Sequence, residues 1–87
     1  MSNNRTPITV DAVDYSVEVG HGGDVIWVYD TNGDMVASGE RDTAVEQFFA
    51  FSIDPEDGEE THLSAGRDIY DQQDPLEIAR WMVGAQA

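Results

Sequence analysis

The chain has 87 residues and a formal net charge of −14 at pH 7, with 18 acidic residues against four basic ones. This length allows one domain, and the lack of cysteine excludes disulfide bonds and thiolate metal sites. No run of about 18 apolar residues is present, so we expect no membrane-spanning helix. No charged segment followed by an apolar one opens the chain, so we expect no export signal.

The charge is informative about the solvent. The chain has no lysine, and all of its cations are arginine, namely Arg5, Arg41, Arg67 and Arg80. In this respect the composition resembles that of cytoplasmic proteins of haloarchaea, which work in molar potassium chloride. At about 1 M salt the Debye length falls to roughly 3 Å, which screens the self-repulsion of so acidic a body. The resemblance implies a cytoplasmic location; an acidic protein of a mesophile or a phage is the alternative.

The N-terminal half reads as β-structure. We expect residues 1–7 to form a flexible N-terminus and residues 8–87 a single domain. Residues 8–19 alternate between apolar and polar, which predicts a strand, and a change of phase at Ala12–Val13 predicts a bulge or bend. A glycine-rich turn over residues 20–24 leads to a central apolar strand over residues 25–29.

The next turn fixes a register. Asn32-Gly33 between two apolar runs predicts a type I′ hairpin turn, after which residues 35–38 return as a third strand. This loop pairs Trp27 with Ser38, Val28 with Ala37 and Tyr29 with Val36. The length of the first loop decides which residues of the first strand share a face with those of the next two strands. If that length is even, the face that we expect to form the core carries Val13, Tyr15, Val17, Val19, Ile26, Val28, Met35 and Ala37.

Two helices are predicted after this meander. Thr43 and Glu46 form a potential capping box before a helix over residues 42–53, whose apolar stripe consists of Val45, Phe48, Phe49 and Ser52. An acidic loop follows over residues 54–61, and residues 63–73 fit either a short strand or a helical turn.

The second helix has clearer signals. Asp74 is a good N-cap before Pro75, and Gly84 ends the apolar arc. The predicted fold class is therefore α+β: a three-stranded antiparallel β-meander followed by two helices, in one small domain.

Motifs of known chemistry are lacking in the sequence. His21 and His62 stand alone in predicted loops, so we expect no metal site. Residues 30–34 resemble the start of a calcium loop, but the glycine is fourth rather than sixth and the twelfth position is Arg41 rather than glutamate. With no lysine, cysteine or nucleophile elbow, we expect no enzyme and no cofactor. Four scattered arginines form no basic patch, so we expect no nucleic-acid binding.

The remaining candidate is an apolar surface. The sheet face opposite the core face carries Val25, Trp27, Tyr29 and Val36, which is more than a solvent-facing sheet usually shows. Either the C-terminal helix covers this face with Trp81 and Met82, or the face is an interface between proteins. We expect an interaction or regulatory module that acts as a homodimer, with the candidate interface Val25, Trp27, Tyr29, Val36 and Trp81. Dimerisation through the free edge of the third strand or through the C-terminal helix is a variant. The alternative function is an acidic subunit or decoy that docks a basic protein.

Overall fold

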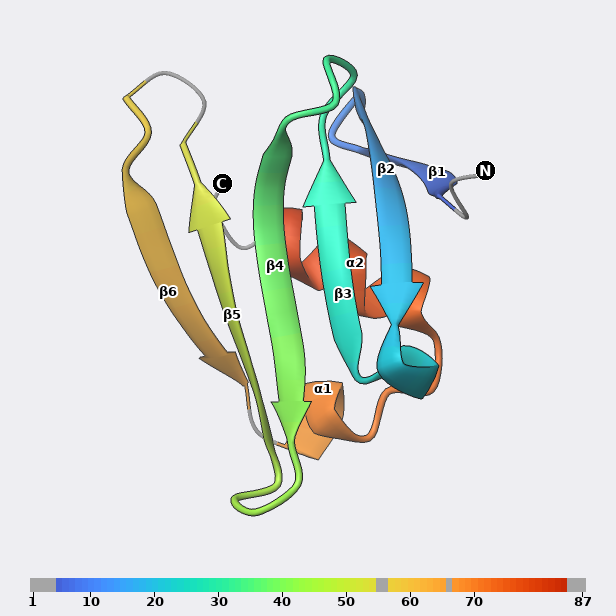
Figure 1. The fold of residues 1–87 in the computed structure, drawn as a ribbon, viewed down its shortest axis with the longest axis vertical. Coiled ribbons are helices and arrows are strands. Elements are labelled where there is room, and N and C mark those ends of the chain that lie inside the picture. Colours follow the sequence, from blue (N-terminus) through green and yellow to red (C-terminus); the bar gives the residue numbers. More distant parts are fainter. Residues whose placement is uncertain (1–4, 55–56, 66, 85–87) are drawn as a thin grey trace.

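A computed structural model describes residues 5–54, 57–65 and 67–84. Within these residues one six-stranded antiparallel sheet is backed by a helix, as Figure 1 shows. The strands are β1 (Thr6–Val10), β2 (Val13–Gly20), β3 (Val25–Tyr29), β4 (Met35–Asp42), β5 (Gln47–Ile53) and β6 (Glu60–Ala65), and they lie side by side in chain order. The helices are the 3₁₀ turn η1 (His21–Gly23), the short α1 (Arg67–Tyr70) and α2 (Pro75–Gly84). The C-terminal helix α2 crosses behind the sheet in Figure 1, and no helix of the described residues lies over the face toward the viewer.

The predicted three-stranded meander followed by two helices is wrong, because the sheet has six strands. One reason lies near the N-terminus. The change of phase at Ala12–Val13 marks a tight hairpin, in which Val10 pairs with Val13 and splits the predicted first strand into β1 and β2. Asp11 and Ala12 between them have φ values of 52° and 66°. Positive φ at both central residues is the geometry of a type I′ turn. β1 begins at Thr6, within the stretch 1–7 that we expected to be flexible, of which residues 1–4 lie outside the described residues.

The second reason is that the predicted helix over residues 42–53 is a hairpin and a strand. Asp42, rather than Thr43, organises the loop, since its Oδ1 accepts a hydrogen bond of 2.9 Å from the backbone N–H of Ala44. Glu46 has a φ of 54°, outside the helical region. β5 then pairs with β4 and β6, so the edge of the third predicted strand is not free.

The hairpin predictions for the centre of the sheet are largely confirmed. Trp27 pairs with Ser38 and Val28 with Ala37, as predicted. The predicted type I′ turn is wrong, because only Gly33 of its two central residues has a positive φ, of 88°. A bulge then shifts the register, so that Tyr29 pairs with Met35 instead of Val36. The first loop comprises the four residues 21–24, because Gly20 pairs with Val25. It is even in length, and the faces of β2, of β3 and of β4 from Ala37 onward divide as predicted. At the start of β4 the prediction is wrong, because the bulge pairs Met35 with Tyr29 on the face opposite the core and places Val36 in the buried core.

The C-terminal part contains both structures that residues 63–73 allow, since β6 ends at Ala65 and α1 follows. The predicted second helix is confirmed as α2. The Oδ1 of Asp74 accepts a hydrogen bond of 3.0 Å from the backbone N–H of Leu76, and Pro75 is the first helical residue. The helix therefore begins directly after its predicted N-cap, Asp74, and extends to Gly84, where the sequence predicts its end.

The core lies between the sheet and α2. Its fully buried large side chains come from both layers and include Val17, Ile26, Val28, Phe48, Ile78 and Met82. Phe48 is 0% exposed and meets Trp81 of α2 edge-on, with ring centroids 6.2 Å apart. Gly39 makes room for this ring, since a Cβ at that position would lie 2.5 Å from Cε1 of Phe48. The core face also extends past the helix, where Val13 and Val19 are exposed.

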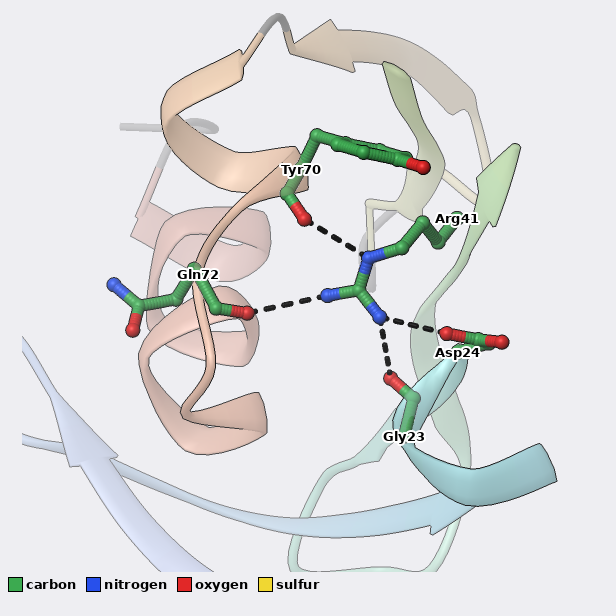
Figure 2. A network of polar contacts seen from close by, with 5 residues as sticks. All are labelled: Gly23, Asp24, Arg41, Tyr70 and Gln72. Atoms are coloured by element: carbon green, nitrogen blue, oxygen red, sulfur yellow. Dashed lines mark hydrogen bonds and ion pairs between the residues drawn. The ribbon is translucent and has the colours of Figure 1, made fainter. Parts of the chain in front are cut away.

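One arginine joins three parts of the fold at the end of β4. The Nε of Arg41 donates to the carbonyl of Tyr70 at 2.9 Å, and its Nη2 donates to the carbonyl of Gln72 at 3.2 Å (Figure 2). Its Nη1 lies 2.7 Å from Oδ1 of Asp24 and donates to the carbonyl of Gly23 at 3.3 Å. The guanidinium therefore holds the β2–β3 loop against the segment that joins α1 to α2.

Candidate functional site

The sheet face opposite α2, called the open face below, carries two continuous rows of residues. Each row runs across the sheet from β2 to β6, because its residues lie directly opposite one another in each of the four successive strand pairs. One row is Glu18, Trp27, Ser38, Phe51 and His62, and the next is Gly20, Val25, Glu40, Phe49 and Ser64. Alternation along a strand places these side chains on the same face. Trp27 and Phe51 thus flank the small Ser38, and Val25 and Phe49 flank the charged Glu40.

The open face exposes aromatic surface that no described element covers. Phe49 is 40% exposed, and Trp27, Tyr29 and Phe51 are half-buried. Trp27 lies over Gly20 of β2, where a Cβ would be 2.7 Å from its Cζ3. The ring therefore leans away from the centre of the face. Contiguous exposed apolar surface of this kind marks interaction sites more often than scattered single residues do.

The residues of the predicted interface are not all on one surface. Val25, Trp27 and Tyr29 share the open face, and α2 does not cover them, because it packs on the other side of the sheet. Val36 lies at the bulge beside Tyr29 and is only 8% exposed, so it offers little surface. Trp81 is on α2 and packs against Phe48 on the far side of the sheet. Val25, Trp27 and Tyr29 therefore belong to one surface. Val36 and Trp81 are not part of it.

Several residues of this surface lie outside the interface predicted from the sequence. The predicted helix includes Phe49 and Phe51, the predicted loops include His62, and Glu40 has no predicted role. The alternation of large and small side chains from Phe49 to Ile53 is the sequence signal that could have placed Phe49 and Phe51 on one face of a strand. Along this segment Phe48, Ala50 and Ser52 are buried, while their neighbours are not.

A shallow recess lies at the centre of the open face. It has a volume of about 320 Å³ and is bordered by side chains of Val25, Ser38, Glu40, Phe49, Phe51 and His62. The rings of Phe51 and His62 are 6.4 Å apart and tilted by 44°. The recess exists because Ser38 is short while its cross-strand neighbours Trp27 and Phe51 are large.

Charges on the open face are unevenly partnered. The guanidinium carbon of Arg5 lies 3.7 Å from the ring centroid of Tyr29, and its Nε is 3.5 Å from Oε1 of Glu18. In contrast, the Glu40 side chain, which is also exposed, has no hydrogen bond or ion pair with any residue that the structure describes. The other arginines are paired elsewhere, with Asp24, Glu46 and Glu77 respectively for Arg41, Arg67 and Arg80. The described chain thus has no cation left for Glu40.

The other candidate groups are occupied by structural contacts. In the turn after β3, Oδ1 of Asp30 accepts hydrogen bonds of 2.9 Å from the backbone N–H groups of Asn32 and Asp34. His21 is in η1, and His62 is in β6 rather than in a loop. In the parts of the chain that are described, no three metal-ligating side chains come together. On the helix side of the sheet, burial raises the pKa of Tyr15 above its ordinary value, and the charge of Asp11 raises it further.

No helix within the described ranges combines the length and the apolar character that a membrane crossing requires.

No family model, no curated protein and no solved structure matches this chain. The open face therefore has to be interpreted from its own chemistry.

Proposed function

We propose that this protein is a small protein–protein interaction module that binds a basic partner protein through its open face. The observation that carries the proposal is an exposed aromatic surface with the carboxylate of Glu40 at its centre, which no described residue pairs. Trp, Tyr and Phe are the side chains most often enriched in the buried centre of interfaces. The role is that of an acidic subunit or regulatory module, without catalysis.

The charge of the chain supports a basic partner. A net charge of −14 attracts a cationic surface over long range and speeds the encounter. A second copy of the chain would instead place Glu40 against another acidic face, and every arginine of the described residues already has an acidic neighbour. Burying a carboxylate without a counter-ion is costly. The homodimer is therefore the second candidate, favoured only by the size of the exposed aromatic surface.

The solvent that we propose is a cytoplasm rich in potassium chloride, in line with the composition. Long-range attraction is weak in such a solvent, since the Debye length at about 1 M salt is only roughly 3 Å. Ion pairs that are desolvated inside an interface are screened much less. The aromatic contacts and the Glu40 contact would then provide affinity, and the remaining charge would provide solubility.

Site-specific photo-crosslinking in the cells that produce the protein tests this proposal. A photoreactive phenylalanine analogue is placed at Phe49, on the open face, or at Val13, which is 49% exposed on the other face. We expect adducts with basic proteins from position 49 alone, and we expect Glu40→Gln to weaken them. Equal labelling from both positions, or adducts with acidic proteins, would contradict the proposal. An adduct of two copies of this chain would replace it with the homodimer.

A further inference from the structure

We infer that the recess on the open face receives a cationic side chain of the partner, arginine in preference to lysine, with Glu40 as its counter-ion. This inference rests on the proposed function and specifies what the partner must present. The recess borders on two phenylalanines and one carboxylate, and no cation of the described chain is bound there.

The same open face already holds one arginine in this manner. Arg5 stacks on Tyr29 at 3.7 Å and lies 3.5 Å from Glu18. Tyr29 is opposite Ser16 in the β2–β3 pair, so Glu18 is its diagonal neighbour, two residues along β2. The guanidinium is thus held between an aromatic ring and a carboxylate from the adjacent strand.

The recess repeats this arrangement on strands β4 and β5. Glu40 is directly opposite Phe49, and it is the diagonal neighbour of Phe51, which is opposite Ser38. The short Ser38 leaves the space between the rings open, and the volume of about 320 Å³ can hold a long side chain. Two aromatic rings and one carboxylate are therefore in place, and only the cation is supplied by another molecule.

The chemistry of the recess favours a guanidinium over an ammonium. A planar guanidinium can stack on the rings of Phe49 and Phe51 and still present paired N–H groups to the carboxylate of Glu40. An ammonium is compact and more strongly hydrated, so it loses more hydration on entering the same space. Arginine is also the more frequent cation over aromatic faces in proteins.

A titration followed by two-dimensional ¹H–¹⁵N NMR tests the recess directly. The probe is the blocked tripeptide Leu-Arg-Leu, compared with Leu-Lys-Leu and with a neutral peptide that has citrulline in place of arginine. We expect saturable shifts at Ser38, Glu40, Phe49 and Phe51 with the arginine probe. Binding should be about threefold weaker for lysine and about tenfold weaker for citrulline, because the neutral side chain loses both the ion pair and the cation–π contact.

Two variants and one control assign these effects. Glu40→Gln should weaken arginine binding about threefold and reduce, without removing, the preference over citrulline, because the cation–π contact remains. Ser38→Trp should occupy the recess with a large ring and abolish the saturable shifts. Glu77→Gln on α2 changes the net charge equally, on the other side of the sheet, and should leave the affinity within about twofold. Dispersed spectra of each variant establish that it is folded.

The outcomes separate the two proposals. Equal affinity for the arginine and citrulline probes, no effect of Glu40→Gln, or no saturable binding would overturn the inference about the recess. These results would leave the crosslinking from position 49 to decide the proposed function. Arginine-specific binding in the recess without any adduct from position 49 would support the recess and contradict the proposed function.

Discussion

At the scale of single residues, the turn between β1 and β2 is the least predictable feature. Asp11 and Ala12 adopt positive φ, which aspartate tolerates but alanine rarely adopts. The sequence pattern does show the change of phase at Ala12–Val13. It cannot distinguish a hairpin from a bulge, because Asp-Ala carries no glycine or asparagine to indicate the turn.

Ala12→Gly should stabilise the protein. Ala12 has a φ of 66°, a region that is strained for alanine and open to glycine. We expect a gain of about 0.5–1 kcal/mol in the free energy of unfolding, measured by urea denaturation.

The reverse change at Gly33 is the matched control. Gly33 has a φ of 88°, and a Cβ added there would have no neighbouring atom within 4 Å, so Gly33→Ala tests the backbone alone. It should lower the free energy of unfolding by about 1 kcal/mol. A loss of stability in Ala12→Gly would mean that the turn does not have this geometry.

Arg41 is the other residue whose role depends on the fold rather than on the sequence. Its side chain is only 16% exposed, and its guanidinium donates to three carbonyl groups that are distant in sequence. Arg41→Lys keeps the charge but cannot reach all of these acceptors. The expected loss is about 2–3 kcal/mol, because hydrogen bonds from a charged group are lost and partly buried carbonyls stay unpaired.

Arg67→Lys provides the comparison for this substitution. Arg67 is 64% exposed and pairs with Glu46 and Asp71 at the surface. Thermal unfolding of this variant should show a loss below about 0.5 kcal/mol. Equal effects at the two positions would contradict the role assigned to Arg41.

At the scale of elements, the sequence predicts the helix α2 and the presence of a hairpin around Asn32-Gly33, because local signals determine both. It does not predict the turn type or the bulge of that hairpin. The prediction for β5 is wrong since Phe48, Phe49 and Ser52 fit a helical stripe as well as an alternating strand. Pairing with β4 and β6 decides between the two, and that pairing is a property of the assembled sheet. The recess cannot be predicted for the same reason, because it needs the register of the four strands β3 to β6 at once.

The adjacent residues Phe48 and Phe49 test the strand assignment. Phe48 is 0% exposed in the core and Phe49 is 40% exposed on the open face. Phe48→Ala should lower the free energy of unfolding by about 3–5 kcal/mol, and Phe49→Ala by less than about 1 kcal/mol; both are measured by urea denaturation. In the helix predicted from the sequence, both would face the sheet and the losses would be similar.

At the scale of the whole molecule, the charge and the size act together. The described part measures 34 × 31 × 20 Å, and the chain carries a net charge of −14. Each arginine has an acidic neighbour, which leaves most carboxylates to repel one another. The composition already predicts this repulsion between carboxylates. The fold shows in addition which acidic residues lack a neighbouring cation among the described residues.

Stability should therefore rise with salt. Raising potassium chloride from 0.1 to 2 M should screen the repulsion, and a gain of about 2 kcal/mol corresponds to an increase of roughly 10 °C in Tm. The variant Glu40→Gln, which removes a carboxylate without a partner among the described residues, should be more stable than the parent at 0.1 M and should respond less to salt. A Tm that is independent of salt would argue against the proposed solvent.

The strand order β1 to β6 also has a consequence for the rate of folding. Every strand pairs with its neighbours in the sequence, so the sheet can grow hairpin by hairpin, with short loop closures. The longest closure is the docking of α2, where Nη1 of Arg80 donates to the carbonyl of Thr9 at 3.0 Å across 71 residues. If α2 docks after the main barrier, Met82→Ala should accelerate unfolding and leave refolding nearly unchanged in stopped-flow measurements, whereas slower refolding would place α2 in the nucleus. The sheet would then form first, and α2 would dock on it afterwards and stabilise it.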